Sequence, residues 1–142
     1  MLQQTLSAPS HTDDMAFDWK EYLKLAQSLQ GHSGSSFSQE AAFRCAVSRA
    51  YYAAFCYARK YAQDNESYVR PTKNEHKALR EHFEKSLPSG SSQVDGRDKI
   101  ATNLQKLKLL RNKCDYEDIV ANIEDKLLTS LDLAEEIITT LT

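Results

Sequence analysis

The sequence contains few of the residues that form turns. Its 142 residues include four glycines and three prolines, fewer than an all-β domain needs for the turns between its short strands. The glycines are scattered and do not form a phosphate-binding loop. No run of about 18 apolar residues occurs, the length at which a helix can cross a bilayer. These absences disfavour a β-rich fold, a P-loop nucleotide site and a membrane span.

Cysteine is also scarce, and the three residues Cys45, Cys56 and Cys114 are odd in number. Cys45 and Cys56 lie on one expected helix, about 16 Å apart along its axis, which is too far for a disulfide. Free thiols suit a reducing compartment. Polar residues and a proline interrupt the first apolar stretch, so it does not resemble a secretory signal. We therefore expect a cytoplasmic protein.

Charge is nearly balanced overall but divided locally. The formal net charge of −2 gives no general basic field that would attract nucleic acid. Six basic residues and one acid occupy positions 97–113, whereas eight acids and one lysine occupy positions 115–136. Either these are two solvated helix faces that pair across the fold, or the basic strip receives phosphates.

Apolar residues recur at helical spacing along most of the chain, and no segment alternates as a strand does. Residues 1–12 are expected to be disordered, and residues 13–142 to form a single domain. Helices are predicted over about 14–30 and 37–65, from a capping box at Thr72, from about 98 to a break near Cys114 and Asp115, and from about 116 onward. The expected fold is an all-α, up-and-down bundle of four to five helices.

The second predicted helix has two distinct sides. With about 100° per residue, Phe43, Val47 and several alanines form one stripe, which we assign to the core. Tyr51 and Tyr52 point about 100° apart, so one is expected in the core and the other at a groove or a partner subunit. Ser48 and Arg49 are expected at the surface or at an interface.

The histidines do not indicate a metal site. A di-iron bundle needs Glu-x-x-His pairs, and none of the four histidines has a glutamate three residues before it. His76 and His82 are six residues apart, on opposite faces of a helix, so we interpret them as exposed surface residues. We expect neither a metal nor another cofactor.

Two segments, AVSRAYYAAF at 46–55 and LRNKCDY at 110–116, stand out. Together, in this order and in a helical chain of this size, they resemble the HEPN domain family over about residues 17–141. The resemblance implies a helical bundle that pairs into a homodimer. It also implies kinship with metal-independent ribonucleases of toxin and defence systems, whose minimal forms are often encoded beside a nucleotidyltransferase that acts as antitoxin.

The active site of such ribonucleases has an arginine, a polar residue after it and a histidine four to six residues beyond it. By this resemblance Arg111 is the motif arginine and Asn112 the polar residue, while Tyr116 stands where the nearest histidine would be. A phenol with a pKa of about 10 transfers protons poorly near neutral pH. Arg111 can still hold a phosphate through two parallel hydrogen bonds.

Three functions follow as hypotheses. The first is a module that binds RNA or a nucleotide and pairs with a nucleotidyltransferase in a toxin–antitoxin or defence-type system. The second is an active ribonuclease that uses Arg111 with Tyr116 or Asp115, and the third is a purely structural helical partner. The candidate catalytic residues are Arg111, Asn112, Asp115 and Tyr116, and the candidate ligand or dimer-interface residues are Ser48, Arg49, Tyr51, Tyr52, Lys108 and Lys113.

Local structural roles remain open for the same residues. Arg111 and Asp115 are four residues apart, so they can form an ion pair within one continuous helix. Asp115 can instead cap the last helix. Tyr116 can simply pack its ring and donate a hydrogen bond.

Overall fold

The computed structural model describes residues 16–32, 36–85 and 96–142. In these ranges all regular structure is helical, which confirms the expected all-α bundle. The helices are α1 (Lys20–Gln30), α2 (Gln39–Asn65), α3 (Glu75–Glu84), α4 (Arg97–Tyr116) and α5 (Ile123–Leu141). The predicted disorder of residues 1–12 and most of the expected loop at 87–96 lie outside the described residues.

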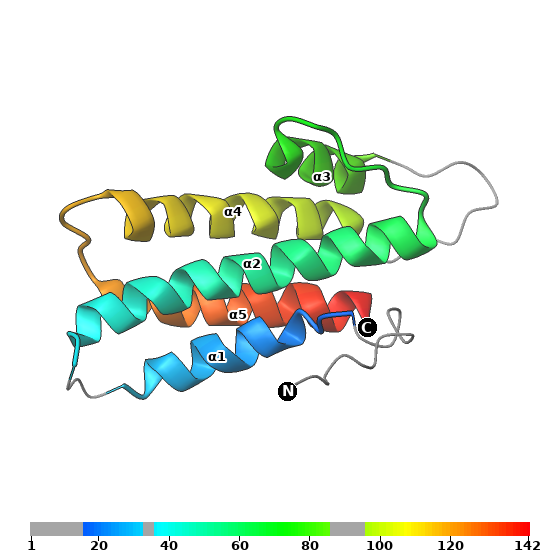
Figure 1. The fold of residues 1–142 in the computed structure, drawn as a ribbon. Helices are drawn as coiled ribbons and strands as arrows, with labels where there is room; N and C mark the ends of the chain where they lie inside the picture. Colours follow the sequence, from blue (N-terminus) through cyan, green and yellow to red (C-terminus); the bar gives the residue numbers. More distant parts are fainter. Residues whose placement is uncertain (1–15, 33–35, 86–95) are drawn as a thin grey trace, which may run out of the picture.

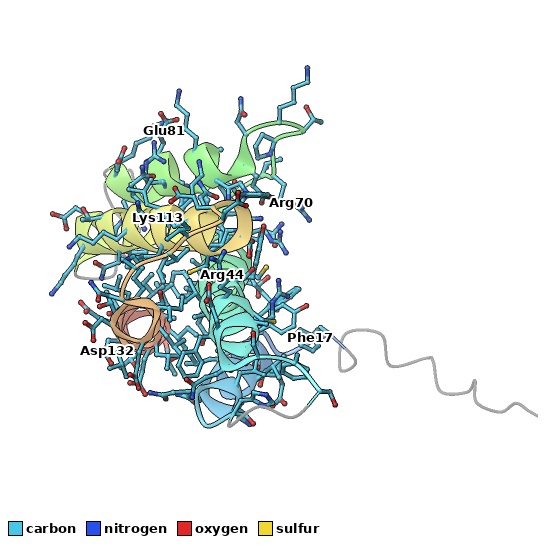
Figure 2. All side chains as sticks on the ribbon, turned by 90° about the vertical axis from the view of Figure 1, so that its left-hand side faces the viewer. Phe17, Arg44, Arg70, Glu81, Lys113 and Asp132 are labelled. Atoms are coloured by element: carbon cyan, nitrogen blue, oxygen red, sulfur yellow. The ribbon has the colours of Figure 1, made fainter. Side chains whose placement is uncertain are left out.

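Helices α1, α2, α4 and α5 run side by side, and each runs opposite to the one before it in this order (Figure 1). The central one is α2, which packs against α1, α4 and α5. The short α3 lies on α4, on the side away from α1. In the end view of Figure 2, α5 covers one side of α2, while the opposite side of α2 faces outward between α1 and α4. This uncovered side of α2 carries the residues that matter below.

The sequence of α2 explains its central position. Ser38 accepts a hydrogen bond of 3.0 Å from the Ala41 amide and so caps the first turn. Seven alanines of this helix are buried, and their small side chains let three other helices approach closely. Two of these neighbours contribute larger groups: Leu107 of α4 and Leu127 of α5 are fully buried, and each such leucine stabilises the fold by about 1.5–3 kcal/mol.

Four predicted helix boundaries were wrong. The capping box at Thr72 does not form, because α3 begins at Glu75 after a left-handed Asn74 (φ 56°). Glu75 lies 3.5 Å from Arg59 and 3.1 Å from Arg70, so its carboxylate forms ion pairs with these arginines instead of reaching back to a backbone amide. Long-range charge pairing therefore outweighs the local motif.

Two more of these errors concern the connection between α4 and α5. Helix α4 does not break near Cys114 and Asp115 but continues to Tyr116. Helix α5 begins at Ile123 rather than near Tyr116, after a left-handed Asn122 (φ 53°). The first helix also starts later than predicted, since Ala16–Trp19 are not helical. The turn between α4 and α5 is thus longer than expected, and Tyr116 sits at its entrance.

Candidate functional site

An alternating row of arginine and tyrosine side chains crosses the uncovered side of α2. The Arg49 guanidinium lies 4.7 Å from the Tyr22 ring and 5.3 Å from the Tyr52 ring. The Arg111 guanidinium lies 5.2 Å from the Tyr52 ring and 5.4 Å from the Tyr116 ring. We call these five residues the Arg–Tyr ladder. It joins α1, α2 and the end of α4.

Helix geometry accounts for the ladder. Arg49 and Tyr52 are three residues apart on α2, so they share one face of that helix. Arg111 is five residues before Tyr116 in the last turns of α4, where the chain lies beside α2. Each contact places a guanidinium within about 6 Å of a ring, the range of cation–π attraction. The two segments that resemble the HEPN family, 60 residues apart in sequence, therefore meet in space.

Arg111 is held on several sides. Its Nε atom lies 2.8 Å from Oδ2 of Asp115, one turn further along α4, so the ion pair that the spacing allowed is present. Its Nη1 atom donates to the side-chain oxygen of Asn112 at 3.1 Å, and its Nη2 atom lies 3.4 Å from the Tyr116 hydroxyl. Asp115 also accepts from the Ser48 hydroxyl at 3.4 Å. Apart from the two lysines of α4, the predicted site residues on α2 and α4 thus form one connected cluster.

The exposed fractions in this cluster show what a ligand can reach. The side chain of Arg111 is 16% exposed and that of Asp115 is 27% exposed, whereas Tyr116 is 71% exposed. The exposed Tyr116 ring is therefore accessible to a ligand beside an arginine that is itself only partly exposed. Asp115 offsets the charge of Arg111, but a guanidinium has five N–H donors and the described contacts do not use them all.

Tyr51 and Tyr52 occupy different environments. Tyr51 is 1% exposed and lies in the core, and burial raises the pKa of its phenol, so it stays protonated. Tyr52 is half-buried within the ladder. The two rings are edge to face with centroids 5.1 Å apart. Tyr51 is thus a supporting residue rather than a residue that touches a ligand.

His76 was missed by the sequence analysis, which interpreted it as an exposed surface residue. Its Nδ1 atom is hydrogen-bonded to the Tyr51 hydroxyl. Its ring lies 5.5 Å from that of Tyr51, 4.8 Å from that of Phe55 and 6.4 Å from that of Tyr52. Burial, and then the nearby charges of Lys108 and Arg111, lower the pKa of its imidazole below 6.5. No local sequence motif predicts this contact, because 25 residues separate His76 from Tyr51.

The basic strip on α4 is only partly paired with acids. Lys99 lies 3.1 Å from Glu136 of α5, Arg97 lies 2.6 Å from Glu66, and Arg111 pairs with Asp115. Lys106, Lys108 and Lys113 have no ion pair within the described ranges. Lys108 is half-buried near His76, whereas Lys113 is exposed and the structure shows no contact between it and the ladder. The charge pattern therefore corresponds to pairing at one end of α4 and unpaired lysines toward the other.

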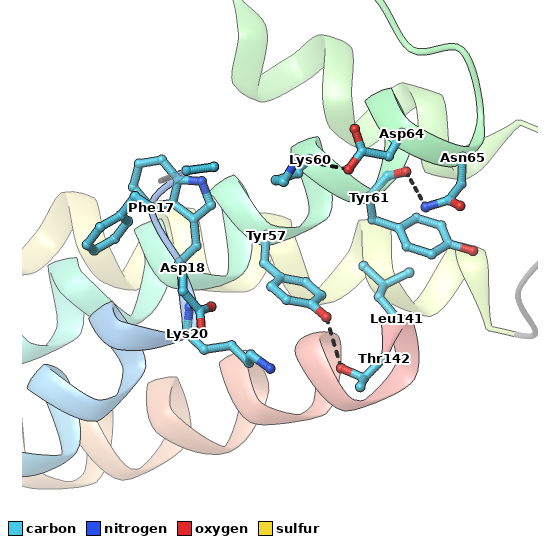
Figure 3. A pocket seen from close by; sticks show the side chains of 12 residues that line it. Phe17, Asp18, Lys20, Tyr57, Lys60, Tyr61, Asp64, Asn65, Leu141 and Thr142 are labelled. Carbon is cyan, nitrogen blue, oxygen red and sulfur yellow. Dashed lines mark hydrogen bonds and ion pairs between the residues drawn. The ribbon is translucent and has the colours of Figure 1, made fainter. Parts of the chain in front are cut away.

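A separate cavity of about 580 Å³ lies at the opposite end of the bundle from Tyr116. Figure 3 shows it between the start of α1 and the ends of α2 and α5. Its polar groups bind one another: Lys60 lies 2.9 Å from Asp64, and the Tyr57 hydroxyl lies 3.1 Å from Thr142 Oγ1. It contains no residue of the HEPN-like segments 46–55 and 110–116. We therefore do not place the functional site there.

The described residues give little support for a metal site or for reactive thiols at the two buried cysteines. These residues contain no cluster of three or more His, Cys, Asp or Glu side chains suited to a metal. Burial raises the pKa of Cys56 and of Cys114, which keeps both thiols protonated and unreactive. None of the described helices combines the length and the apolar character that a bilayer crossing needs.

A scan against protein-family models found no match, and searches of the curated proteins and of the solved structures found none either. The function is therefore inferred from the residues and from their geometry.

Proposed function

We propose that this protein is a HEPN-like module that binds RNA or a nucleotide through the Arg–Tyr ladder. The observation that carries the proposal is the position of Arg111, whose partly exposed side chain brings its guanidinium within 5.2 Å of the Tyr52 ring and 5.4 Å of the Tyr116 ring. Arginine binds phosphate through paired hydrogen bonds, and tyrosine rings stack on bases. Guanidinium groups and aromatic rings in alternation thus supply both kinds of contact that a nucleotide strand offers.

The unpaired lysines add to this support. Lys108 and Lys113 lie on α4 on either side of Arg111 in sequence, without acidic partners in the described ranges. They supply local positive charge in a chain whose net charge is −2. Phosphate contacts of this kind make binding salt-dependent, because each neutralised phosphate releases counterions.

Binding is favoured over cleavage by the chemistry at position 116. The ribonucleases of the family that this chain resembles have a histidine in their motif, whereas position 116 carries a tyrosine, a residue type that transfers protons poorly near neutral pH. Asp115 is engaged with Arg111 and Ser48. Arg111 can therefore hold a phosphate without efficient proton transfer by the residues at positions 115 and 116.

We also propose that the module forms a homodimer and pairs with a nucleotidyltransferase in a toxin–antitoxin or defence-type system. The nucleotidyltransferase rests on the family resemblance alone. The homodimer has support from exposed apolar side chains toward the end of α4 and in the turn after it: Leu109 is 52% exposed, Tyr116 71% and Ile119 85%. Apolar surface of this kind is typical of protein interfaces.

The test is a combined RNA-binding and RNA-cleavage assay. Labelled total tRNA and a labelled single-stranded oligoribonucleotide are incubated without metal with the wild type, with Arg111→Ala and with Arg70→Ala. Arg70 is the control, since its side chain is 53% exposed and lies outside the ladder. We expect Arg111→Ala to weaken binding about tenfold and to reduce the salt dependence, with no effect of Arg70→Ala.

The other outcomes decide between the remaining hypotheses. Cleavage that disappears in Arg111→Ala would replace the proposal with an active ribonuclease. Neither binding nor cleavage would leave the structural helical partner, and co-purification with a co-expressed nucleotidyltransferase would then be the deciding measurement.

A further inference from the structure

We propose that His76, oriented by Tyr51, is a neutral hydrogen-bond donor to the phosphate group bound at Arg111. This inference rests on the proposed function, since it adds a residue from a third helix to the same site. The ligand class is the phosphate of a nucleotide, either within an RNA strand or free. Three observations support this role: the position of the His76 imidazole, the hydrogen bond that one of its nitrogens makes, and the charges that surround it.

The imidazole lies beside the ladder. Tyr52 contacts both groups: its ring centroid is 5.2 Å from the Arg111 guanidinium carbon and 6.4 Å from the His76 ring centroid. Lys108 and Arg111 are three residues apart on α4 and therefore share a face of that helix. Both are close enough to His76 to lower its pKa. Arg111 and His76 thus both lie against the Tyr52 ring, and Lys108 lies on the α4 face that carries Arg111.

The hydrogen bond to Tyr51 determines which nitrogen of His76 is free. The Tyr51 side chain is buried, and within the described residues its hydroxyl has His76 Nδ1 as its only side-chain hydrogen-bond partner. A buried hydroxyl needs an acceptor for its proton, so Tyr51 donates to Nδ1. The neutral ring then carries its own proton on Nε2. Nε2 has no hydrogen-bond partner among the described residues, and the side chain is half-buried, so this N–H can donate to a ligand.

The surrounding charges keep the donor neutral. Burial and the charges of Lys108 and Arg111 lower the pKa of His76, while Glu75 on the same helix raises it. Tyr51 and Tyr52 of α2 also face the ring, and burial raises the pKa of Tyr51. His76 therefore offers an N–H at neutral pH without adding a third positive charge to the cluster. A neutral donor next to two cations suits a phosphate oxygen.

The experiment has two arms. In the first, long-range ¹H–¹⁵N spectra of the free protein report the tautomer of His76, and a titration with 5′-AMP or inorganic phosphate follows its ring signals. In the second, fluorescence anisotropy with a labelled single-stranded oligoribonucleotide compares the wild type with His76→Phe, His76→Gln, Arg111→Ala and the control His32→Phe. His32 is also half-buried and stacks on Phe37 at 4.4 Å, away from the ladder.

We expect the Nε2–H tautomer in the free protein and a change of the His76 signals on titration. His76→Phe keeps a planar ring but has no donor, so binding weakens about tenfold, the effect of one hydrogen bond to a charged group. The Gln amide nitrogen takes the place of Nε2, so His76→Gln stays within about threefold of the wild type. His32→Phe leaves binding unchanged. Circular dichroism verifies that each variant is folded.

Each other result has a defined meaning. An Nδ1–H tautomer, or unchanged binding by His76→Phe while Arg111→Ala weakens binding, overturns the role of His76 and leaves the proposed function intact. Wild-type protein that binds neither the oligonucleotide nor AMP overturns both. Binding of the oligonucleotide without AMP or phosphate identifies an RNA strand as the ligand, and saturable AMP binding at similar affinity identifies a free nucleotide.

Discussion

Arg44 of α2 donates a hydrogen bond of 2.6 Å to the main-chain carbonyl of Glu117, the residue directly after the last residue of α4. The same guanidinium donates to the carbonyls of Cys114 and Asp118, each at 3.1 Å. The last carbonyls of a helix have no partners within it, and here one side chain from another helix satisfies several of them. Arg44, which is labelled in Figure 2, thereby fixes the turn that follows Tyr116.

We predict that Arg44→Ala lowers the free energy of unfolding by about 1–3 kcal/mol, because carbonyl groups at the end of α4 lose a charged donor. Urea unfolding followed by circular dichroism measures the change. Arg44→Lys should recover only part of it, since an ammonium group cannot reach several carbonyls in the same geometry.

The matched control is Glu40→Ala, which removes the carboxylate 2.9 Å from Arg44 but leaves the carbonyl contacts in place. Glu40 is 53% exposed, so its loss should cost no more than about 0.5 kcal/mol. Equal effects of Glu40→Ala and Arg44→Ala would mean that the ion pair, and not the end of α4, is what Arg44 stabilises.

A buried charge cluster joins the ends of three other segments. Glu66, whose side chain is 1% exposed, lies 2.6 Å from Arg97 and 2.8 Å from His82. We predict that Glu66→Gln destabilises the protein by about 3 kcal/mol, because Arg97 is left buried without a counter-charge. Thermal unfolding with Asp64→Asn as control measures this, since the Lys60–Asp64 pair is more than half exposed. A loss as small as that of the control would show that water solvates Arg97.

The sequence predicted those parts of the fold that depend on one helix at a time. The apolar period of α2, the different environments of Tyr51 and Tyr52 and the spacing of Arg111 and Asp115 are all local, so they could be foreseen. Contacts between helices could not. His76 meets Tyr51 across 25 positions, and Arg44 meets Glu117 across 73. The capping box predicted at Thr72 does not form for the same reason: Glu75 forms ion pairs with arginines outside α3.

The exposed apolar residues toward the end of α4 and in the turn after it predict a homodimer interface. We expect light scattering at micromolar concentration to give the mass of a dimer for the wild type and of a monomer for Ile119→Asp. Val69→Asp is the matched control, because Val69 is 82% exposed and Ile119 is 85% exposed, yet Val69 lies in the connection between α2 and α3. A monomeric wild type, or equal effects of both substitutions, would contradict this interface.

The lowered pKa of His76 predicts a loss of stability in acid. The unfolded chain binds a proton at His76 as the pH falls through about 6.5, whereas the folded protein resists protonation because the imidazole is buried near Lys108 and Arg111. The unfolded state therefore gains protons first, and stability falls as the pH decreases. The contribution of His76 is fully present above its unfolded pKa and is lost below it.

Thermal unfolding of the wild type and His76→Phe between pH 7.5 and 5.5 tests this prediction at constant ionic strength. The melting temperature of the wild type should fall more steeply, because only the wild type must protonate this imidazole against burial and two nearby cations. Adding phosphate should reduce the difference, since an anion bound at Arg111 favours the imidazolium. Parallel curves for the two proteins would show that solvent reaches His76 freely, and the neutral-donor role would then lose its physical basis.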